Sequence, residues 1–438
     1  MAIASSGAPI GRSPADPNVL VIGGGIAGLF CAYFLRQAGH SVTLVERMTI
    51  GDPRGCSSGN TGFVGIGGAP MAGPGTLGNG LRSLLRPDDR LAVPPTLDPD
   101  RLRWLLRLRR AGSQDEVRRV AAVMLEMKRR SLEILREARD STGPGTGFSA
   151  TGMVQAYKSP ASFARARQAV PVAVAGGVPL RVLSPEELRA IEPDCDFDIA
   201  GALYNDSGGF MHAPDFAIAF AEVLAGLGVQ LLDNCAVLGF EARDGSVLRV
   251  VTDAGVLHPD EVVLAAGSWS GALARQLDIR LPVQPVRGYA VTVERPRNGP
   301  RGPVHLVEGT VAVRALGDRL RFAGDLTLAG MSRSISRRRV ARLVRTVREH
   351  LPSLTWDPKP QVWVGLRPCT PDSLPLIGRA PGWRNLSIAA GHGHNGMGLA
   401  PVAGQLLAQL LDGKPTAMDA SPLRVGRYSI GSSERGER

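Results

Sequence analysis

The chain of 438 residues exceeds the length that one hydrophobic core usually serves, so two lobes are expected. Its hydrophobic fraction of 44% and charged fraction of 21% are typical of globular proteins, and it has no run of about eighteen uncharged apolar residues that would indicate a spanning helix. The net charge is +11, but only four of the 51 basic residues are lysines, so the excess is an arginine bias that need not mark a binding surface.

The composition of both ends of the chain predicts a tail at each end. Residues 1–17 are rich in Ala, Ser, Gly and Pro and lack the apolar segment of a secretory signal, which predicts a disordered tail, and residues 424–438 predict a second, polar one. The five cysteines form no C-x-x-C pair, so neither a zinc site nor a disulfide framework is expected. Free thiols without an export signal favour a cytoplasmic location.

A basic segment over residues 101–110 leaves the relation to membranes open. Its leucines, Leu102, Leu105, Leu106 and Leu108, are interspersed with arginines in a pattern that suits a helix lying on a bilayer. The same pattern suits a helix that packs on its own protein and exposes a basic face. Two interpretations therefore stand, a packed helix or a peripheral contact with the inner face of the membrane.

The first folded segment predicts a dinucleotide-binding unit. Residues 18–22 form a nearly all-apolar run, as expected of a parallel strand buried on both faces. A G-x-G-x-x-G pattern follows at Gly23, Gly25 and Gly28, then a predicted helix over residues 29–38 and a second strand over 41–45. Glu46 stands at the end of that strand, where a carboxylate accepts hydrogen bonds from ribose hydroxyls.

Each glycine of this pattern has a distinct structural role. The first permits a tight turn, the second lets backbone approach a pyrophosphate, and the third lets helix and strand pack closely while the helix N-terminus faces the phosphates. A carboxylate at Glu46 would repel a 2′-phosphate, so adenosine with a free ribose is favoured. NAD and FAD both satisfy this unit, because they present the same ADP half.

Later segments resume the α/β pattern after a long different stretch. Residues 214–227 predict a helix, residues 229–232 and 236–241 predict short strands, and residues 262–266 predict an apolar strand that ends at Gly267. Such a strand returns to the first sheet and brings backbone close to the nucleotide. The first domain is therefore expected to be discontinuous.

The C-terminal region predicts a second glycine turn before a helix. Residues 365–378 predict a proline-punctuated loop running into a strand, residues 386–390 another strand, and residues 399–411 an apolar helix. Between them lies a glycine-rich turn over residues 391–398, which is a second anion site at a helix N-terminus. Two such sites favour FAD, which has a pyrophosphate and a flavin edge that becomes negative on reduction.

Several motifs together carry a family resemblance. The N-terminal glycine pattern, Ala-Gly-Ser-Trp at 266–269, Gly-Leu-Arg-Pro at 365–368 and Ala-Gly-His-x-x-Asn-Gly at 390–396 resemble the D-amino-acid oxidase superfamily of flavoproteins. The run Thr-Pro-Asp…Leu-Ile-Gly-Arg at 370–379, Gly-Gln-Leu-Leu-Ala at 404–408 and Ser-Ser-Gly-Asn-Thr-Gly at 57–62 are similar to the bacterial D-amino-acid dehydrogenase and glycine oxidase branches. The resemblance implies an α/β fold in which a Rossmann-like FAD-binding domain is interleaved with an α+β substrate domain that contains a mixed, antiparallel-rich sheet.

The predicted domains are both discontinuous. Residues 18–80, 205–281 and 361–423 are assigned to the FAD-binding domain, and residues 81–204 and 282–360 to the substrate domain. Within these, residues 81–142 are expected to be mainly helical, residues 283–321 rich in strands, and residues 335–350 a basic helix.

The resemblance also implies which residues hold the cofactor. Around the pyrophosphate and adenosine these are Gly23, Gly25, Ile26, Gly28, Glu46, Arg47 and Val237. Along the path to the flavin and around its ring they are Ser57, Ser58, Asn60, Thr61, Gly62, Gly267, Trp269, Gly393, Asn395, Gly396 and Met397. No cysteine matches the position that tethers FAD covalently in the sarcosine oxidase branch, so noncovalent FAD is expected.

Arg367 and His392 are the predicted catalytic residues. Arg367 matches the arginine that clamps the substrate carboxylate in these relatives, and a planar guanidinium suits bidentate binding of a carboxylate. His392 is expected near the flavin edge. The implied reaction oxidises a D-amino acid, glycine or a secondary amine by hydride transfer from Cα to flavin N5, and the imine then hydrolyses.

Two departures concern the substrate site. His394 stands where the glycine-oxidase-like branch carries arginine, and residues 309–314 lack the tyrosine that assists the carboxylate in some relatives. Tyr289 is a candidate substitute from a neighbouring strand. His392 and His394 lack nearby acidic or cysteine partners, so no metal site is expected.

Several alternatives remain open from the sequence. The chain could be the flavoprotein subunit of a multi-protein dehydrogenase, or an oxidase acting on a modified RNA base, although aromatic residues are only 5% and provide no stacking motif, which makes nucleic acid an improbable partner. The N-terminal unit alone also fits an NAD-dependent dehydrogenase. The electron acceptor is left open among oxygen, a quinone and a carrier protein.

Overall fold

The computed structural model describes residues 18–66, 70–71, 73, 91–94, 97–142, 148–356 and 359–428, with side chains described up to residue 139 in the helix that ends at 142. The predicted tail over residues 1–17 lies outside this part of the chain. Residues 424–428, which the sequence assigned to the second tail, include the short helical turn Val425–Tyr428. There Arg427 forms a 2.9 Å ion pair with Asp372.

The N-terminal glycine unit belongs to a six-stranded sheet that is parallel except at one edge, where β20 runs antiparallel to β21. In spatial order its strands are β10 (Gln230–Leu232), β2 (Ser41–Val45), β1 (Asn18–Ile22), β14 (Glu261–Leu264), β21 (Leu386–Ala390) and β20 (Leu376–Arg379). The apolar run of β1 lies at the centre because β1 pairs with both β2 and β14.

The two faces of this sheet are covered differently. One face packs into a core with the helices α1 (Ile26–Gln37), α4 (Gln114–Thr142), α7 (Ala213–Gly226) and α10 (Gly396–Leu411). The other face packs against α8 (Ser270–Arg275) and a three-stranded antiparallel sheet made of β11 (Val237–Arg243), β12 (Ser246–Thr252) and β13 (Gly255–Leu257). The sequence predicted the start of β11 but neither β12 nor β13.

A second, larger sheet has nine strands and is mostly antiparallel. Its order is β19 (Gln361–Cys369), β15 (Gln284–Glu294), β18 (Arg319–Thr327), β17 (Val311–Leu316), β16 (Val304–Leu306), β6 (Met153–Tyr157), β8 (Gly201–Asn205) and β7 (Leu180–Leu183), with β4 (Leu91–Ala92) beside β18. The strands β3 (Phe63–Val64), β9 (Gly209–Met211) and β5 (Phe148–Ser149) form a separate three-stranded sheet. These sheets confirm the predicted fold class.

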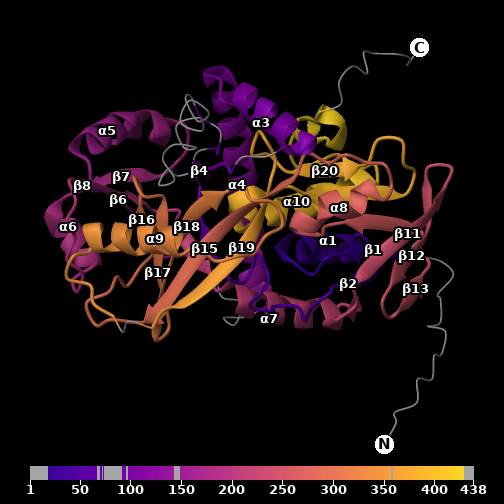
Figure 1. The fold of residues 1–438 in the computed structure, drawn as a ribbon, viewed down its shortest axis with the longest axis horizontal. Coiled ribbons are helices and arrows are strands. Elements are labelled where there is room, and N and C mark those ends of the chain that lie inside the picture. The colour runs from indigo at the N-terminus through magenta and orange to yellow at the C-terminus, as the bar shows by residue number, and fades with distance from the viewer. Residues whose placement is uncertain are drawn as a thin grey trace, which may run out of the picture.

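The helix α9 (Arg337–His350) covers one face of the nine-stranded sheet, and together they bury a core that includes Phe322, Leu343 and Val347. Figure 1 shows α5 (Pro160–Ala175) and α6 (Pro185–Ile191) at one end of the molecule and the β11–β13 sheet at the other. The remaining helix, α3 (Pro99–Ala111), precedes α4. Short helical turns occur at Gly267–Trp269, Gly393–Asn395 and Ser421–Leu423.

The segment that carries Arg367 differs from its prediction. The sequence predicted a loop from residue 365, but residues 365–369 are the second half of strand β19, which pairs with β15 from Gln361 to Cys369. Pro368 is tolerated because β19 is an edge strand, where a missing N–H breaks no ladder. The domain boundaries stay predictions, and the pairing of β19 favours placing residues 361–369 with the larger sheet.

Candidate active site

A cavity of about 1730 Å³ is bordered by both large sheets. On the six-stranded side, its walls come from the segments that directly follow β1, β2, β14 and β21. These are the carboxyl ends of parallel strands, where open α/β sheets bind ligands. On the nine-stranded side, its walls come from residues of β6, β16, β17, β18 and β19, among them Gln155, His305, Ala312, Ala323 and Arg367.

The first glycine turn is closely packed. Gly23 has a φ of +115°, and its N–H donates to the carbonyl of Val45 at 2.8 Å. A Cβ on Gly28 would lie only 1.8 Å from the carbonyl oxygen of Gly23, so the third glycine brings helix α1 against the turn. Gly25 forms the N-cap of α1 and lines the cavity. The backbone N–H groups at the start of α1 therefore face a space suited to an anion.

The segment that follows β2 carries the predicted charged pair, Glu46 and Arg47. The Glu46 carboxylate accepts hydrogen bonds from the backbone N–H groups of Gly24 at 2.7 Å and Met48 at 3.0 Å. The guanidinium of Arg47 lies 3.7 Å from the ring centroid of Trp269, within the range of a cation–π contact. Burial lowers the pKa of Arg47. Val237 also lines the cavity.

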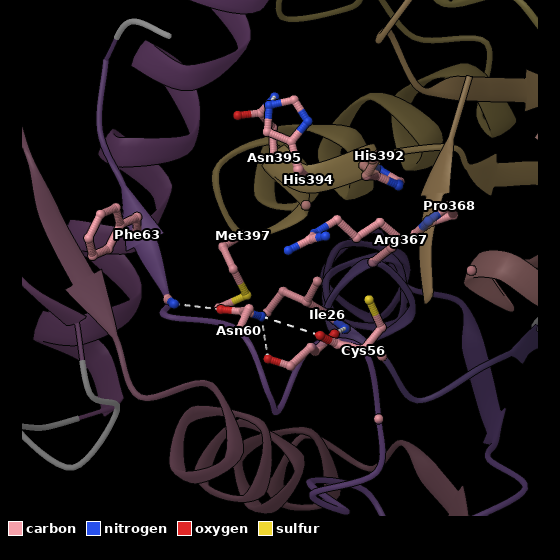
Figure 2. A pocket seen from close by; sticks show the side chains of 18 of the residues that line it. Ile26, Cys56, Asn60, Phe63, Arg367, Pro368, His392, His394, Asn395 and Met397 are labelled. Atoms are coloured by element: carbon pink, nitrogen blue, oxygen red, sulfur yellow. Dashed lines mark hydrogen bonds between the residues drawn. The ribbon is translucent and has the colours of Figure 1, made fainter. Parts of the chain in front are cut away.

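The side-chain amide of Asn60 stabilises the loop over residues 56–62 by hydrogen bonds to the loop's own backbone. The Asn60 side chain donates to the carbonyl of Ser57 at 2.5 Å and accepts from the N–H of Gly62 at 2.5 Å, as the dashed lines of Figure 2 show. The Ser57 hydroxyl accepts from the N–H of Ile26 at 3.3 Å, which ties this loop to the start of α1.

Two arginines of the nine-stranded sheet hold the same loop from outside. Arg314 donates to the carbonyls of Thr61 at 2.9 Å and Met211 at 2.8 Å. Arg321 donates to the carbonyls of Ser58 and Asn60, each at 3.3 Å. The pKa of Arg314 is lowered to about 9. Burial is the main cause, and repulsion from Arg321 is the second. These contacts fix the loop against the larger sheet.

The second glycine turn feeds α10, which begins at Gly396. Met397 is buried and lines the cavity together with Gly393 and Asn395. His392 is 4% exposed, burial lowers the pKa of its imidazole to about 4, and its Nε2 is a buried atom without a hydrogen-bond partner within the described part of the chain. A neutral imidazole therefore stands at this turn.

Arg367 reaches into the cavity from β19. Figure 2 shows its guanidinium directed into the space between Met397 and His394, with Cys56 below it. Its Nη1 donates to the backbone carbonyl of Asp325 at 2.8 Å. A Cβ on Gly288 would lie 1.8 Å from that same Nη1, so the bare glycine of β15 leaves the room that the guanidinium occupies.

His394 lies at the same end of the cavity. Its side chain borders the open space and so keeps much of its surface accessible, while its Nε2 lies 3.1 Å from the Asn395 amide nitrogen. The surrounding protein lowers the pKa of His394 to about 3, chiefly by desolvation and then by repulsion from Lys128, Arg367 and His305. His394 is therefore neutral in a markedly positive environment.

The cavity brings together nearly all the residues singled out in the sequence. Of the predicted catalytic and cofactor-binding residues, Gly28 alone does not line it, because its role is the close packing of α1. The lining residues that sequence reasoning did not single out include Cys56, Lys128, Gln155, His305 and Trp363. Tyr289, the candidate substitute tyrosine, is fully buried and contacts Ser334 and Ser336, so it does not line the cavity.

Among the described helices, none is long and apolar enough to cross a bilayer. Within the same residues, no group of three or more His, Cys, Asp or Glu side chains is arranged to hold a metal ion.

Comparison with known proteins identifies the family. Residues 18–410 match the family described as DAO, FAD dependent oxidoreductase. The chain belongs to this family. The match confirms the resemblance found in the sequence and FAD as the cofactor. The alternative of an NAD-dependent dehydrogenase is therefore wrong. This FAD-dependent oxidoreductase is similar to the D-amino acid dehydrogenase of Bradyrhizobium diazoefficiens, with 33% identity over 423 residues that cover 94% of this chain and 99% of that protein.

Other relatives of this oxidoreductase agree over similar lengths. The D-amino acid dehydrogenase of Methylobacterium radiotolerans is 34% identical over 424 residues, covering 94% of this chain and all of that protein (100%). The solved structure of glycine oxidase from Geobacillus kaustophilus has a TM-score of 0.72 at 23% identity and covers 95% of this chain and 100% of that chain. L-proline dehydrogenase from P. horikoshii has a TM-score of 0.69 at 21% identity, with 94% and 96% covered. These structures share the fold.

The residues present fit FAD. A side chain on Gly267, at a φ of +54°, would meet no atom within 4 Å, so the backbone here faces open space at the end of the nucleotide wall. At the opposite wall, the buried Nε2 of His392 has hydrogen-bonding capacity that no described protein group uses. A long ligand with a phosphate group at one glycine turn and a polar ring at the other satisfies both features.

Proposed function

We propose that this protein oxidises a small D-amino acid or a related amine, with FAD bound noncovalently and the substrate carboxylate bound by Arg367. The observation that carries the proposal is the position of Arg367, whose guanidinium enters the cavity beside the second glycine turn and is steadied by the Asp325 carbonyl. The relatives named D-amino acid dehydrogenase, at 33% and 34% identity over nearly full length, support the substrate class.

The proposed cofactor contacts follow the cavity wall from one glycine turn to the other. Gly23, Gly25 and Ile26 would present backbone to the pyrophosphate, while Gly28 keeps α1 close. Glu46, Arg47 and Val237 would hold the adenosine end. The loop residues Ser57, Ser58, Asn60, Thr61 and Gly62, with Gly267 and Trp269, would line the path to the ring, and Gly393, Asn395, Gly396 and Met397 would face the flavin.

The substrate's Cα–H bond breaks and the hydrogen leaves with the bond's electron pair as a hydride, while the amine nitrogen releases one proton to water, so a C=N bond forms. Bound FAD would supply the acceptor for that hydride. Water then hydrolyses the imine to a 2-oxo acid and ammonia. The chain's own contribution is position: Arg367 binds the carboxylate bidentately and so fixes the orientation of Cα. His392 contributes a neutral imidazole at the ring edge, because burial keeps its pKa near 4.

The experiment that tests this function is an anaerobic screen of the purified protein. The protein should be yellow and should release FAD, with no flavin left on the polypeptide, when it is denatured. D-amino acids, glycine and secondary amines are then added without oxygen, with L-amino acids as the control. Bleaching of the flavin absorbance by D-amino acids supports the proposal. A colourless protein that cannot be reconstituted with FAD, or a flavin that no amine bleaches, contradicts it.

We also propose that α3 makes a peripheral membrane contact. Trp104 and Leu108 pack inward at 1% exposure, whereas Leu102 and Leu106 are 45% and 63% exposed on a helix that also exposes Arg109. An apolar pair flanked by arginines suits an anionic lipid surface, and a membrane location would suit a quinone as electron acceptor. Sedimentation with anionic vesicles, compared between the wild type and the Leu102→Ser/Leu106→Ser double variant, tests the contact. Equal binding by both proteins contradicts it.

A further inference from the structure

One end of the cavity belongs to none of the contacts proposed above. Its walls come from helix α5 and from strands of the nine-stranded sheet that are not adjacent to the edge strand β19. We call this end the side branch, and its lining includes Gln155, Tyr157, Ala169, Ala173, Leu180 and Val307. A space of this kind can hold a part of the substrate that the carboxylate contact leaves free.

A row of paired residues leads from Arg367 towards the side branch. The guanidinium of Arg367 donates to the carbonyl of Asp325 on β18 at 2.8 Å, so a carboxylate bound by this guanidinium lies near that strand. Neighbouring strands lie about 4.8 Å apart, so the three steps from β18 through β17 and β16 to β6 span roughly 14 Å. Along these strands the register partners that line the cavity are Ala323, Ala312, His305 and Gln155.

The row faces the cavity because its neighbours along the strands face the other way. Val154, Val313 and Phe322 belong to the core that the sheet forms with α9. Successive side chains of a strand alternate between the two faces of a sheet. Ala312 and Ala323 therefore border the cavity with only a methyl group each, which leaves room above the sheet for a substrate side chain.

Helix α5 covers the far end of this row. Gly201 pairs with Tyr157, so the two share the cavity face, and a Cβ on Gly201 would lie 2.3 Å from the ring of Phe163 in α5. The rings of Phe163 and Tyr157 are 5.9 Å apart between centroids. No residue of α5 is buried, and Ala169 and Ala173, four residues apart and so on one side of the helix, line the cavity. The space between α5 and the sheet is therefore the side branch, and the exposed Ala169 places its mouth at the molecular surface.

The side branch is uncharged and largely apolar. Its described lining has no lysine, arginine or carboxylate. Two of its polar side chains bind each other, because the Tyr157 hydroxyl donates to the Gln155 side-chain carbonyl at 3.2 Å. A charged group that entered this space would lose hydration without meeting an opposite charge, whereas an alkyl or aromatic group would gain from the removal of its surface from water.

We propose that the side branch binds the side chain of the substrate, and that the preferred substrates are D-amino acids with a long aliphatic or an aromatic side chain. This inference rests on the proposed function and narrows its substrate class. With the α-carboxylate bound by Arg367, the side chain runs over Ala312 and ends between Tyr157 and Ala173. Ala312 and Ala173 are then specificity-determining residues, because their small size keeps the path open.

The test measures anaerobic flavin reduction at low substrate concentration with D-alanine, D-norleucine and D-2-aminooctanoate, whose side chains increase in length. We expect the second-order rate constant to rise by up to about fourfold for each added methylene, the factor for its full burial, and D-norleucine to exceed D-alanine by about tenfold or more. D-lysine carries an ammonium at the end of the norleucine chain and should react more slowly than D-norleucine.

Two variants narrow the path at different distances from Arg367. Ala312→Leu should slow D-norleucine and D-2-aminooctanoate by about tenfold and leave D-alanine within about twofold of the wild type. Ala173→Leu, at the far end, should slow D-2-aminooctanoate alone. The matched control is Ala164→Leu, which adds the same side chain at an exposed position of α5 that does not line the cavity, and it should leave all three rates unchanged. Flavin content and circular dichroism of each variant establish that it is folded.

Three outcomes overturn the inference while leaving the proposed function intact. One is a wild type that reacts with D-alanine as fast as with the longer substrates, or with D-lysine faster than with D-norleucine. Another is an Ala312→Leu variant that slows all three substrates by the same factor. The third is an Ala173→Leu variant that reacts with D-2-aminooctanoate at the wild-type rate, since the chain then does not reach α5.

A flavin that no amine reduces would instead refute the proposed function. The side branch is then tested by calorimetric binding of hexanoate and propanoate, which are norleucine and alanine without the amino group. A preference for hexanoate that Ala312→Leu abolishes and Ala164→Leu retains supports the inference. Equal affinities in the wild type, or a preference that Ala312→Leu retains, overturn it.

Discussion

Arg367 is fixed by the backbone of Asp325, whose carbonyl accepts its Nη1–H at 2.8 Å. Asp325 adopts a φ of +70°, which is unusual for a residue with a side chain, and its carboxylate pairs with Arg339 at 2.9 Å in a nearly inaccessible site. The ion pair therefore stabilises the backbone conformation that presents the carbonyl to Arg367. A residue outside the cavity thus helps to position the group that binds the substrate.

Replacing Arg339 with methionine should destabilise the protein. The buried Asp325 carboxylate would lose its ion-pair partner, and breaking a buried pair on one side typically costs about 3–5 kcal/mol. Urea unfolding measures the loss. The double variant Arg339→Met/Asp325→Asn should recover part of the stability, because it removes the uncompensated charge. A single variant within about 0.5 kcal/mol of the wild type would rule out this role for the pair.

The third glycine of the first turn should tolerate no side chain. In Gly28→Ala the new Cβ would lie 1.8 Å from the Gly23 carbonyl oxygen, so the turn must move, and a cost of about 1–3 kcal/mol together with much weaker FAD binding is expected. FAD affinity is measured by reconstitution of the apoprotein. Gly226→Ala is the control, since a Cβ at that helical glycine meets nothing within 4 Å and should leave affinity and stability near the wild type. Equal FAD affinity in both variants would contradict this.

The arginines that donate hydrogen bonds to the 56–62 loop should strengthen FAD binding, although they do not bind the substrate. Arg314→Met would leave the carbonyls of Thr61 and Met211 without this donor, at about 1–3 kcal/mol. We expect a lower stability and a faster loss of FAD, measured by thermal unfolding and by flavin release on dilution. Arg319→Met, at a half-exposed position on the neighbouring strand β18, should change neither. Unchanged flavin release in Arg314→Met would show that the loop is held by other contacts.

The buried imidazole of His392 should make the protein sensitive to acid. Its pKa is lowered to about 4 by burial, whereas an unfolded histidine titrates near 6.5, so between these values the unfolded state binds more protons. Stability is then full above about pH 6.5 and falls as the pH drops towards 4, by up to about 3 kcal/mol from this residue. Urea unfolding at several pH values with saturating FAD measures the slope. His392→Asn should have a shallower slope in that window, and an identical slope would exclude His392 as its source.

Much of the fold was predictable because the signals are local. The N-terminal unit of strand, glycine pattern, helix and second strand lies within thirty residues. The sequence of each element indicates its secondary structure, so the turn at Gly23 and the position of Glu46 could be predicted. The same holds for the C-terminal turn before α10, whose start the sequence placed only a few residues late, at 399 and not at Gly396.

The rest depended on contacts that sequence spacing does not report. Pro368 suggested a loop because proline cannot join a ladder, and only the pairing of β19 at the sheet edge made a strand possible there. Lys128 lies in a long amphipathic helix with many charges, and its direction towards the cavity is set by packing of α4 against α10, more than 250 residues later. His305 and Gln155 face the cavity because two parallel strands place them side by side.

The central claim is that Arg367 binds the substrate carboxylate in this FAD-dependent oxidoreductase, and one measurement tests it most directly. Anaerobic flavin reduction is followed in the wild type and in Arg367→Ala with a D-amino acid and with its carboxamide. The account predicts that the wild type strongly favours the carboxylate and that Arg367→Ala loses this preference, at a cost of about 2–5 kcal/mol in transition-state binding. A variant that keeps the wild-type preference for the carboxylate would contradict it.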